Sequence, residues 1–314
     1  MRFKRHSDFL CPVSRFRFLT MMVQDSQRAI LPAPHRPRPL DWHDDAVTAS
    51  WLGHATVLIN FFGVNILIDP VLFDRCGIRV PPLTVGPKRY IDSALKPPDF
   101  PRIDLVLLTH AHFDHLDLRT LRKVSRDAVV VTARQTADIF RGIRFRKVIE
   151  LDWSQSCEIE TVHGGITVNA FQLRHWGARM QYDNYRGYNS YLFERGGKRL
   201  GHMGDTARTP AHHLASRGPI DLLCVPIGAY QPWIHAHCTP EEAVAMADEA
   251  QARYLMPIHH QTFKLSWEPM EEPIQRFTHA LQNAPDRIAL TEIGQTFILP
   301  GVIESGAGWF GSSG

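Results

Sequence analysis

Four side chains of the types that bind metal ions fall within six residues of one another, directly after the apolar run Asp104 to Leu108. That run predicts a buried strand, and the four side chains are His110, His112, Asp114 and His115. Side chains two positions apart on extended backbone point the same way, so His110 and His112 can share one ion. The turn that follows the strand carries Asp114 and His115 to another side of the cluster, and the loop can therefore serve two adjacent metals. The competing interpretation is a solvated turn that is rich in histidine by accident.

Further polar residues follow apolar strands later in the chain, namely His175, Asp205, His259 and His260. Each one alone is more often a surface residue or a turn residue than a ligand. Their joint occurrence, in order, after the His cluster favours the interpretation that they are metal ligands. Because strand ends converge along one edge of a sheet, we expect these side chains to meet the His cluster there.

The elements that must position these residues are short strands and a few helices. Strands are predicted at 46–51, 56–61, 64–68, 104–108, 128–132, 146–151, 158–162, 166–173, 190–194, 199–203, 222–227 and 253–258. Helices are predicted at 116–124, 136–141, 240–251 and 271–282, and Thr239 with Glu242 forms a capping box for the third. A run of strands followed by alternating strands and helices occurs twice. The pattern predicts two sheets packed together with helices outside, in one continuous domain.

Composition sets limits on the class of protein. The chain of 314 residues, 44% hydrophobic and 21% charged, is typical of a soluble globular protein. Residues 1–40 hold eight Lys or Arg and two acidic residues, a net of +6, so the rest of the chain sums to 3 − 6 = −3. An acidic body argues against nucleic acid as a partner. Five scattered cysteines without a CxxC pair indicate free thiols in a reducing compartment, and we expect a cytoplasmic protein.

The N-terminal residues form a basic, Pro-rich arm, which we place at 1–40, before a folded domain at 41–300 and a flexible tail at 301–314. No apolar run is long enough to span a bilayer, and charged residues interrupt any secretory signal. The arm's aromatic residues and arginines predict either peripheral contact with an anionic membrane or a loosely packed segment.

Short motifs spread over roughly residues 47 to 285 resemble the N-acyl-phosphatidylethanolamine-hydrolysing phospholipase D group of the metallo-β-lactamase fold. They are Trp51-Leu52-Gly53-His54-Ala55-Thr56, Asp69-Pro70, Gly86-Pro87-Lys88-Arg89, Glu150-Leu151-Asp152-Trp153, His175-Trp176, Gly204-Asp205-Thr206, Pro226-Ile227-Gly228-Ala229-Tyr230, Pro240-Glu241-Glu242-Ala243 and Ile258-His259. That group tends to follow the late His with Trp-Gly-Thr-Phe, whereas this chain has His260-Gln261-Thr262-Phe263. The resemblance implies an α+β fold, the αββα sandwich, and it makes His259 the ligand. His260 then occupies a position in the wall of the site, and its change puts the identity of the substrate in doubt.

The resemblance also implies two zinc ions. His110, His112 and His175 would hold one ion, Asp114, His115 and His259 the other, and Asp205 would bridge them. Manganese or iron would also accept these ligands. A metal-bridging hydroxide would be the nucleophile, so Asp114 and Asp205 count as catalytic residues as well as ligands.

Roles around the ligands follow less directly from the sequence. Asp69 is a candidate partner for a ligand imidazole. His54 and His237 are candidates for orienting a phosphate oxygen or protonating the leaving group, and an exposed residue before a helix cap is the competing interpretation for His237. The aromatic and apolar residues Trp176, Tyr230, Trp233 and Ile234 could wall an acyl pocket or could be packing. We expect substrate choice to lie in the loop at 74–101, in His175-Trp176 and in residues 230–237.

The leading functional hypothesis is a zinc-dependent phosphodiesterase that acts on a phospholipid or a small phosphodiester. Acting like the resembled group, it would release phosphatidic acid and an N-acylethanolamine. One alternative is a lactonase or another hydrolase of small soluble, often phosphorylated substrates, because carbonyl attack needs the same nucleophile. Another is a metal-binding or regulatory protein without catalysis. The sequence carries no prediction of the oligomeric state.

Overall fold

Two β-sheets packed face to face form the body of the protein. The computed structural model describes residues 27–180 and 182–301. The first sheet has the order β15-β1-β2-β3-β6-β7-β8, with β15 (Thr296–Ile298), β1 (Val47–Gly53), β2 (Thr56–Phe61), β3 (Val64–Ile68), β6 (Leu105–Leu108), β7 (Val129–Ala133) and β8 (Lys147–Leu151). The second has the order β14-β13-β12-β11-β10-β9, with β14 (Ala252–Ile258), β13 (Ile220–Pro226), β12 (Lys198–His202), β11 (Ser190–Arg195), β10 (Gly164–Phe171) and β9 (Ser156–Thr161).

Both sheets change from antiparallel to parallel pairing part of the way across. β1, β2 and β3 pair antiparallel, and β3, β6, β7 and β8 pair parallel. The second sheet repeats this arrangement, since β9 to β12 are antiparallel and β12, β13 and β14 are parallel. The predicted order of strands, a run and then an alternation in each half, is confirmed.

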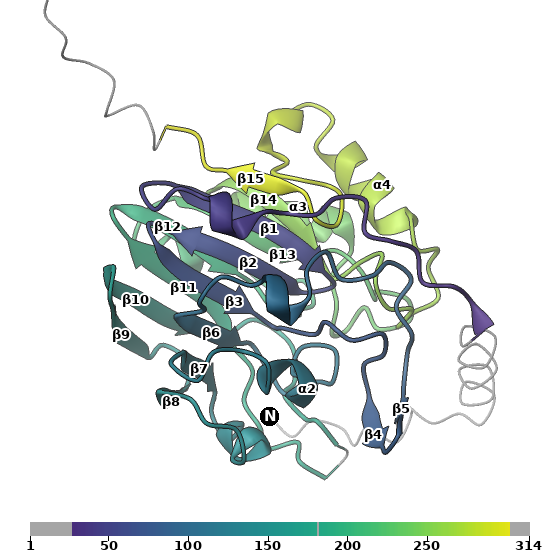
Figure 1. The fold of residues 1–314 in the computed structure, drawn as a ribbon. Helices are drawn as coiled ribbons and strands as arrows, with labels where there is room; N and C mark the ends of the chain where they lie inside the picture. Colours follow the sequence, from purple (N-terminus) through teal and green to yellow (C-terminus); the bar gives the residue numbers. More distant parts are fainter. Residues whose placement is uncertain (1–26, 181, 302–314) are drawn as a thin grey trace, which may run out of the picture.

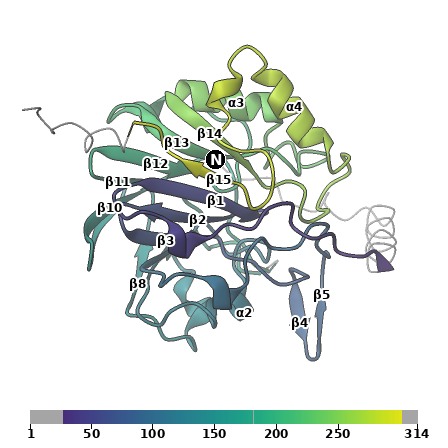
Figure 2. The ribbon, with the colours of Figure 1, turned by 45° about the horizontal axis from the view of Figure 1, so that its top comes forward.

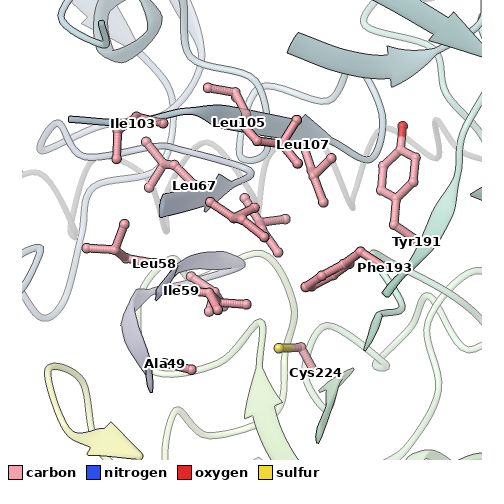
Figure 3. Close-up of a cluster of buried hydrophobic side chains, with 14 of the residues drawn as sticks. Ala49, Leu58, Ile59, Leu67, Ile103, Leu105, Leu107, Tyr191, Phe193 and Cys224 are labelled. Carbon is pink, nitrogen blue, oxygen red and sulfur yellow. The ribbon is translucent and has the colours of Figure 1, made fainter. Parts of the chain in front are cut away.

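The main core lies between the sheets. Figure 3 shows Leu58, Ile59 and Leu67 of the first sheet near Phe193 and Cys224 of the second, all of them members of one buried cluster. Strands β1, β2, β6 and β7 are buried along their whole length. Continuous apolar sequence in these strands reflects cover on both faces.

Helices cover the outer faces unequally. On the second sheet lie α3 (Pro240–Glu249) and α4 (Glu272–Ala280), and α2 (Leu118–Leu121) lies on the opposite side of the sandwich (Figures 1 and 2). The capping box of Thr239 and Glu242 is present at the start of α3. These layers confirm the αββα sandwich.

Two helix predictions and three strands need correction. The helix expected at 116–124 is a single turn, whose first amides are capped by the Asp117 carboxylate, and the helix expected at 136–141 is a 3-10 segment, Ala137–Phe140. Each lies in a crossover between adjacent parallel strands in which loops and turns, including the loop of the His cluster, occupy most of the residues. The expected loop at 74–101 contains a hairpin of β4 (Ile78–Val80) and β5 (Leu83–Val85), and β15 also went unpredicted. Strands of three residues carry too little periodicity to be recognised.

The described part of the N-terminal arm lies against the body. The backbone of Leu31 bonds to Tyr90 and Asp92, and the amide of His35 donates to the carbonyl of Ile293. The predicted domain boundary at residue 40 stays a prediction, and most of the arm, residues 1–26, lies outside the described residues. Among the described residues no helix is long and apolar enough to cross a membrane.

Candidate metal centre

Strand ends from both sheets bring the predicted ligands together. His54 lies in the turn between β1 and β2, and Asp69 directly follows β3. The remaining residues follow β6, β10, β12, β13 and β14, namely His110, His112, Asp114, His115, His175, Asp205, His237 and His259. The expectation of one sheet edge was therefore incomplete, because the cluster lies where the ends of two sheets meet. His54, Asp69 and His259 have φ values of 53°, 41° and 65°, a backbone region that non-glycine residues seldom adopt.

The first group of ligand atoms belongs to His110, His112, His175 and Asp205, and all four atoms lie within 4.8 Å of one another. Nε2 of His110 lies 2.8 Å from Nδ1 of His112, and Nε2 of His175 lies 3.4 Å from the same atom. The Asp205 carboxylate closes the group, at 3.9 Å from His110 and 3.7 Å from His175. Three imidazoles and a carboxylate converging on one point form a donor set that suits a divalent transition metal.

A second group consists of His54, Asp114, His115 and His259, and a third of Asp205, His237 and His259. Asp205 joins the groups, since its Oδ2 lies 3.2 Å from Nε2 of both His115 and His259. Asp114 lies 2.8 Å from Nε2 of His54 and 3.4 Å from Nε2 of His259. The predicted ligands are thus all brought together, and His54 and His237 lie among them.

Several of these buried atoms lack a hydrogen-bond partner among the described residues. They are Nδ1 of His54, Nε2 of His115, both ring nitrogens of His259, Nδ1 of His237 and Oδ1 of Asp205. Buried polar atoms are normally paired, because an unpaired one costs roughly 1 to 3 kcal/mol. Unpaired donor atoms that face one another fit a bound cation, so the residues present fit a metal centre.

Asp69 orients two residues of the cluster. Its Oδ2 lies 2.7 Å from Nδ1 of His115 and accepts the hydroxyl proton of Thr109, while its Oδ1 accepts from the amide of Thr109. Oγ1 of Thr109 lies 2.9 Å from Nδ1 of His110. With a proton on Nδ1, His115 keeps the lone pair of Nε2, on the side of Asp205, available for a cation, which is the tautomer that a ligand needs. Asp69 therefore lies where the sequence analysis expected it, next to the imidazole of a predicted ligand.

Burial and neighbouring charge divide the histidines into two sets. Burial lowers the pKa of His54 and of His112 to about 3 and that of His175 to about 4. Burial also opposes the charged form of His259, but Asp205 and Asp114 outweigh it and raise the pKa of His259 to about 9. Likewise, Asp205, Asp114 and Asp69 overcome burial and raise the pKa of His115 well above its usual value.

The two carboxylates stay ionised. Burial opposes this, yet His115 and the neighbouring histidines together draw the pKa of both Asp114 and Asp205 well below the usual range. Two buried carboxylates thus gather positive charge around them. A divalent cation supplies that charge without requiring protons on the histidines.

Sequence reasoning missed Arg179, a half-buried cation that holds the metal-ligand loop. Its Nη1 donates to the carbonyls of Ala111 and Leu116, at 2.8 and 2.9 Å, and its guanidinium lies over the ring of Phe113. Burial lowers the pKa of Arg179 to about 10, which leaves the side chain charged at neutral pH. No local motif marks an arginine that acts on backbone more than sixty positions away.

The aromatic residues near the ligands take different places. Trp176 is 36% exposed, and its ring centroid lies 4.9 Å from that of His112, so it borders the ligands. Tyr230 is buried and donates to Glu272 of α4, while Trp233 donates to the carbonyl of Leu265, which indicates packing. His260 is also buried, and its ring stacks on Trp51 at 4.3 Å.

Comparisons with known proteins agree with this geometry. The model of a family described as the beta-lactamase superfamily domain matches residues 64–260. An uncharacterised protein of Mycobacterium tuberculosis is 32% identical over 259 residues, which cover 79% of this chain and 68% of that one. N-acyl-phosphatidylethanolamine-hydrolyzing phospholipase D 1 of Caenorhabditis elegans is 30% identical over 241 residues, which cover 72% of this chain and 67% of that one.

A solved structure shares the fold. Igni18, a metallo hydrolase from the archaeon Ignicoccus hospitalis, superposes with a TM-score of 0.61 at 21% identity, over 81% of this chain and 98% of that one. The match to the family model covers more than half of the chain, and both sequence relatives cover most of it. The chain therefore belongs to the beta-lactamase superfamily, as a metal-dependent hydrolase of the metallo-β-lactamase fold with homologues among the N-acyl-phosphatidylethanolamine-hydrolysing phospholipases D.

Proposed function

We propose that this protein is a zinc-dependent phosphodiesterase that cleaves the head-group side of a phospholipid's phosphodiester. The observation that carries the proposal is the junction at Asp205, where one carboxylate joins the donor groups of His110 and of His259. The 30% identity to a phospholipase D of this kind supports a phosphodiester as the substrate. The products would be phosphatidic acid and an N-acylethanolamine.

We assign His110, His112 and His175 to one ion and Asp114, His115 and His259 to the other, with Asp205 shared between them. Two zinc ions bound there would activate water near neutral pH and neutralise charge that develops on a phosphoryl group. Imidazole and carboxylate ligands suit zinc. The unpaired Nε2 of His115 and Oδ1 of Asp205 support this assignment.

His54 has the role of holding Asp114 in place. Its Nε2 lies 2.8 Å from Oδ2 of Asp114, and burial keeps its pKa at about 3, so the ring is neutral and donates one proton to the carboxylate. That hydrogen bond leaves Asp114 its other lone pairs for a cation. His54 is thus a positioning residue in this proposal and not the proton donor to the leaving group.

His237 is the residue that meets the substrate. Its Nδ1 is buried without a partner and lies 3.9 Å from Oδ2 of Asp205, and burial lowers its pKa well below the usual value. A neutral imidazole at neutral pH can donate one hydrogen bond to a phosphate oxygen. We propose that His237 orients the phosphodiester next to the shared carboxylate.

The test compares three substrates under the same conditions. They are vesicles that contain N-acyl-phosphatidylethanolamine, the soluble diester bis-p-nitrophenyl phosphate, and a panel of lactones. We expect turnover of both phosphodiesters, with phosphatidic acid as the lipid product. Turnover of lactones with no cleavage of either diester would overturn the proposal in favour of a lactonase.

A further inference from the structure

The hairpin of β4 and β5 presents an uncovered apolar face. Ile78 pairs with Val85 and Val80 with Leu83, so these four side chains share one face of the ribbon. All four are exposed: Ile78 by 46%, Val80 by 56%, Leu83 by 68% and Val85 by 56%. Figures 1 and 2 both show the hairpin projecting from the body.

The polar face of the hairpin contacts the protein at Thr84, which is half-buried, whereas Arg79 on the same face is exposed. Arg79 pairs with Thr84 on this face, and Nη1 of Arg119 in α2 donates to Oγ1 of Thr84 at 2.9 Å. A surface hairpin ordinarily buries its apolar face and exposes its polar one. Here the apolar face is exposed instead, which indicates a partner for it.

The base of the hairpin is fixed to the wall of the metal centre. A Cβ on Gly77 would meet the carbonyl oxygen of Val85 at 2.1 Å, so only glycine permits this close crossing. Cys76, the residue before it, packs with Val71 and Phe263, and the ring of Phe263 lies 5.1 Å from that of His54. The hairpin therefore holds a set position relative to the site.

Charge indicates what kind of surface the hairpin meets. Residues 75–91 contain four basic residues and no acidic one, although Asp74 and Asp92 flank the segment. Arg89 is buried, Arg75 and Lys88 are half-buried, and Arg79 is exposed. Arg79 is exposed near the apolar tip, where the chain turns through Pro81 and Pro82. Arginine beside apolar side chains suits the headgroup region of an anionic membrane, in which the charge meets phosphate and the aliphatic stem stays in the apolar layer.

A second exposed apolar side chain lies on the neighbouring loop. Leu265 packs against the cluster at the base of the hairpin, and Trp267, two residues further on, is 59% exposed. Tryptophan is favoured at membrane interfaces because its ring is apolar and its N–H is polar. The hairpin and Trp267 are thus both linked, through Cys76 and Leu265, to the cluster that contains Phe263.

We propose that the β4–β5 hairpin inserts its apolar face into the surface of an anionic phospholipid membrane and so sets the metal centre beside the lipid headgroups. The choice of a lipid surface over a second copy of the chain rests on the proposed phosphodiesterase function. The basic segment supports the same choice, because a self-pairing face would bring like charges together.

The experiment measures co-sedimentation of the full chain with vesicles, without turnover. The vesicles are phosphatidylcholine alone or phosphatidylcholine with phosphatidylserine. The double variant Val80→Ser/Leu83→Ser should lower the partition coefficient on the anionic vesicles about tenfold, because two apolar side chains leave the interface. The matched control is Val148→Ser/Val162→Ser, at positions 39% and 73% exposed on β8 and on the β9–β10 turn, which should bind as the wild type does.

The outcomes separate this inference from the proposed function. Hairpin-dependent binding supports the inference even if no phosphodiester is cleaved, and cleavage of a soluble diester without vesicle binding overturns the inference alone. Equal binding to vesicles with and without phosphatidylserine would overturn the proposed preference for an anionic membrane. Analytical ultracentrifugation tests for a dimer. If the protein dimerises and the hairpin substitutions dissociate the dimer, the apolar face binds a second copy of the chain, and the membrane proposal is overturned.

A shortened chain separates the hairpin from the basic arm. The chain that lacks residues 1–26 should still lose vesicle binding when Val80 and Leu83 are replaced. Equal binding of the shortened chain with and without these substitutions would overturn the hairpin's role.

Discussion

Nδ1 of His115 lies 2.7 Å from Oδ2 of Asp69, a carboxylate with no solvent exposure. This contact selects the tautomer of a ligand from the far side of its ring. Replacing Asp69 with Asn removes the charge and permits an amide N–H to face the ring. We expect zinc affinity to fall about 10- to 100-fold, measured by competition with a chelator. Because Asp69 also binds Thr109, the variant Thr109→Val serves as a comparison, and an equal loss there would place the effect in Thr109 and its contact with His110 instead.

Asp205 is the residue on which both metal positions depend. The purified protein should contain about two zinc ions per chain by elemental analysis, as expected for paired sites. Asp205→Asn should lower the metal content and hydrolysis of the soluble diester together, while Asp127→Asn, an exposed aspartate elsewhere, should change neither. A metal-free wild type, or full activity in Asp205→Asn, would refute the two-metal mechanism.

The candidate site was predictable where its residues lie close together in the sequence or directly after a recognisable strand. His110 to His115 form a dense motif, and apolar strands before His175, Asp205 and His259 marked their positions at strand ends. The pairing of His54 with Asp114 was not predictable, because it joins positions sixty residues apart through a turn with positive φ. Arg179 was missed because it binds backbone carbonyls that are more than sixty positions away in the sequence.

The fold, too, was predictable in some parts and not in others. The long buried strands and the two outer helices, α3 and α4, follow from periodicity, and the start of α3 follows also from the Thr239–Glu242 capping box. The hairpin of β4 and β5 does not, since its strands are three residues long and its apolar residues face outward. Burial is the property that a pattern of apolar residues ordinarily predicts, so an exposed apolar face misleads it.

His237 distinguishes substrate contact from metal binding. It belongs to a donor group with Asp205 and His259, so it could be a ligand, but we assign it to the phosphodiester. His237→Gln should lower kcat on the soluble diester about 100-fold and leave zinc content unchanged. The exposed His35, replaced in the same way, should leave both unchanged. Loss of one zinc ion in His237→Gln would contradict the assignment and make His237 a ligand.

Arg186 links stability to pH through two carboxylates. Its Nε donates to Asp183 at 2.7 Å and its Nη2 to Asp138 at 3.0 Å. The hydrogen bond from Arg186 lowers the pKa of Asp138. Burial opposes the charged form of Asp183, but the hydrogen bonds from Arg186 and from the backbone of Met180, together with the charge of Arg186, lower the pKa of Asp183. A depressed carboxylate pKa stabilises the fold above the unfolded value, near 4, and this stabilisation is lost as pH falls through the folded value.

Arg186→Gln should therefore cost about 2 kcal/mol of unfolding free energy at neutral pH and progressively less on acidification. Urea titrations between neutral pH and pH values below the unfolded carboxylate pKa measure the difference. Arg195 donates to the backbone carbonyls of Gly165 and Phe62, so Arg195→Gln should show no such decline. An unfolding difference for Arg186→Gln that stays constant with pH would show that the guanidinium acts through the carbonyl of Gln135 and not through the two carboxylates.

The segment before β1 contributes to stability although its sequence resembles a linker. Leu31 exchanges backbone hydrogen bonds with Tyr90 and Asp92 at 2.8 Å, and the amide of His35 donates to Ile293 at 3.2 Å. A chain that begins at residue 41 loses all three bonds, and we expect its unfolding free energy to fall by about 3 kcal/mol in urea titrations. A chain that begins at residue 27 keeps them and is the matched control. Equal stability of the two shortened chains would show that residues 27–40 lie on the surface without holding it, and the boundary predicted at residue 40 would then describe the folding unit.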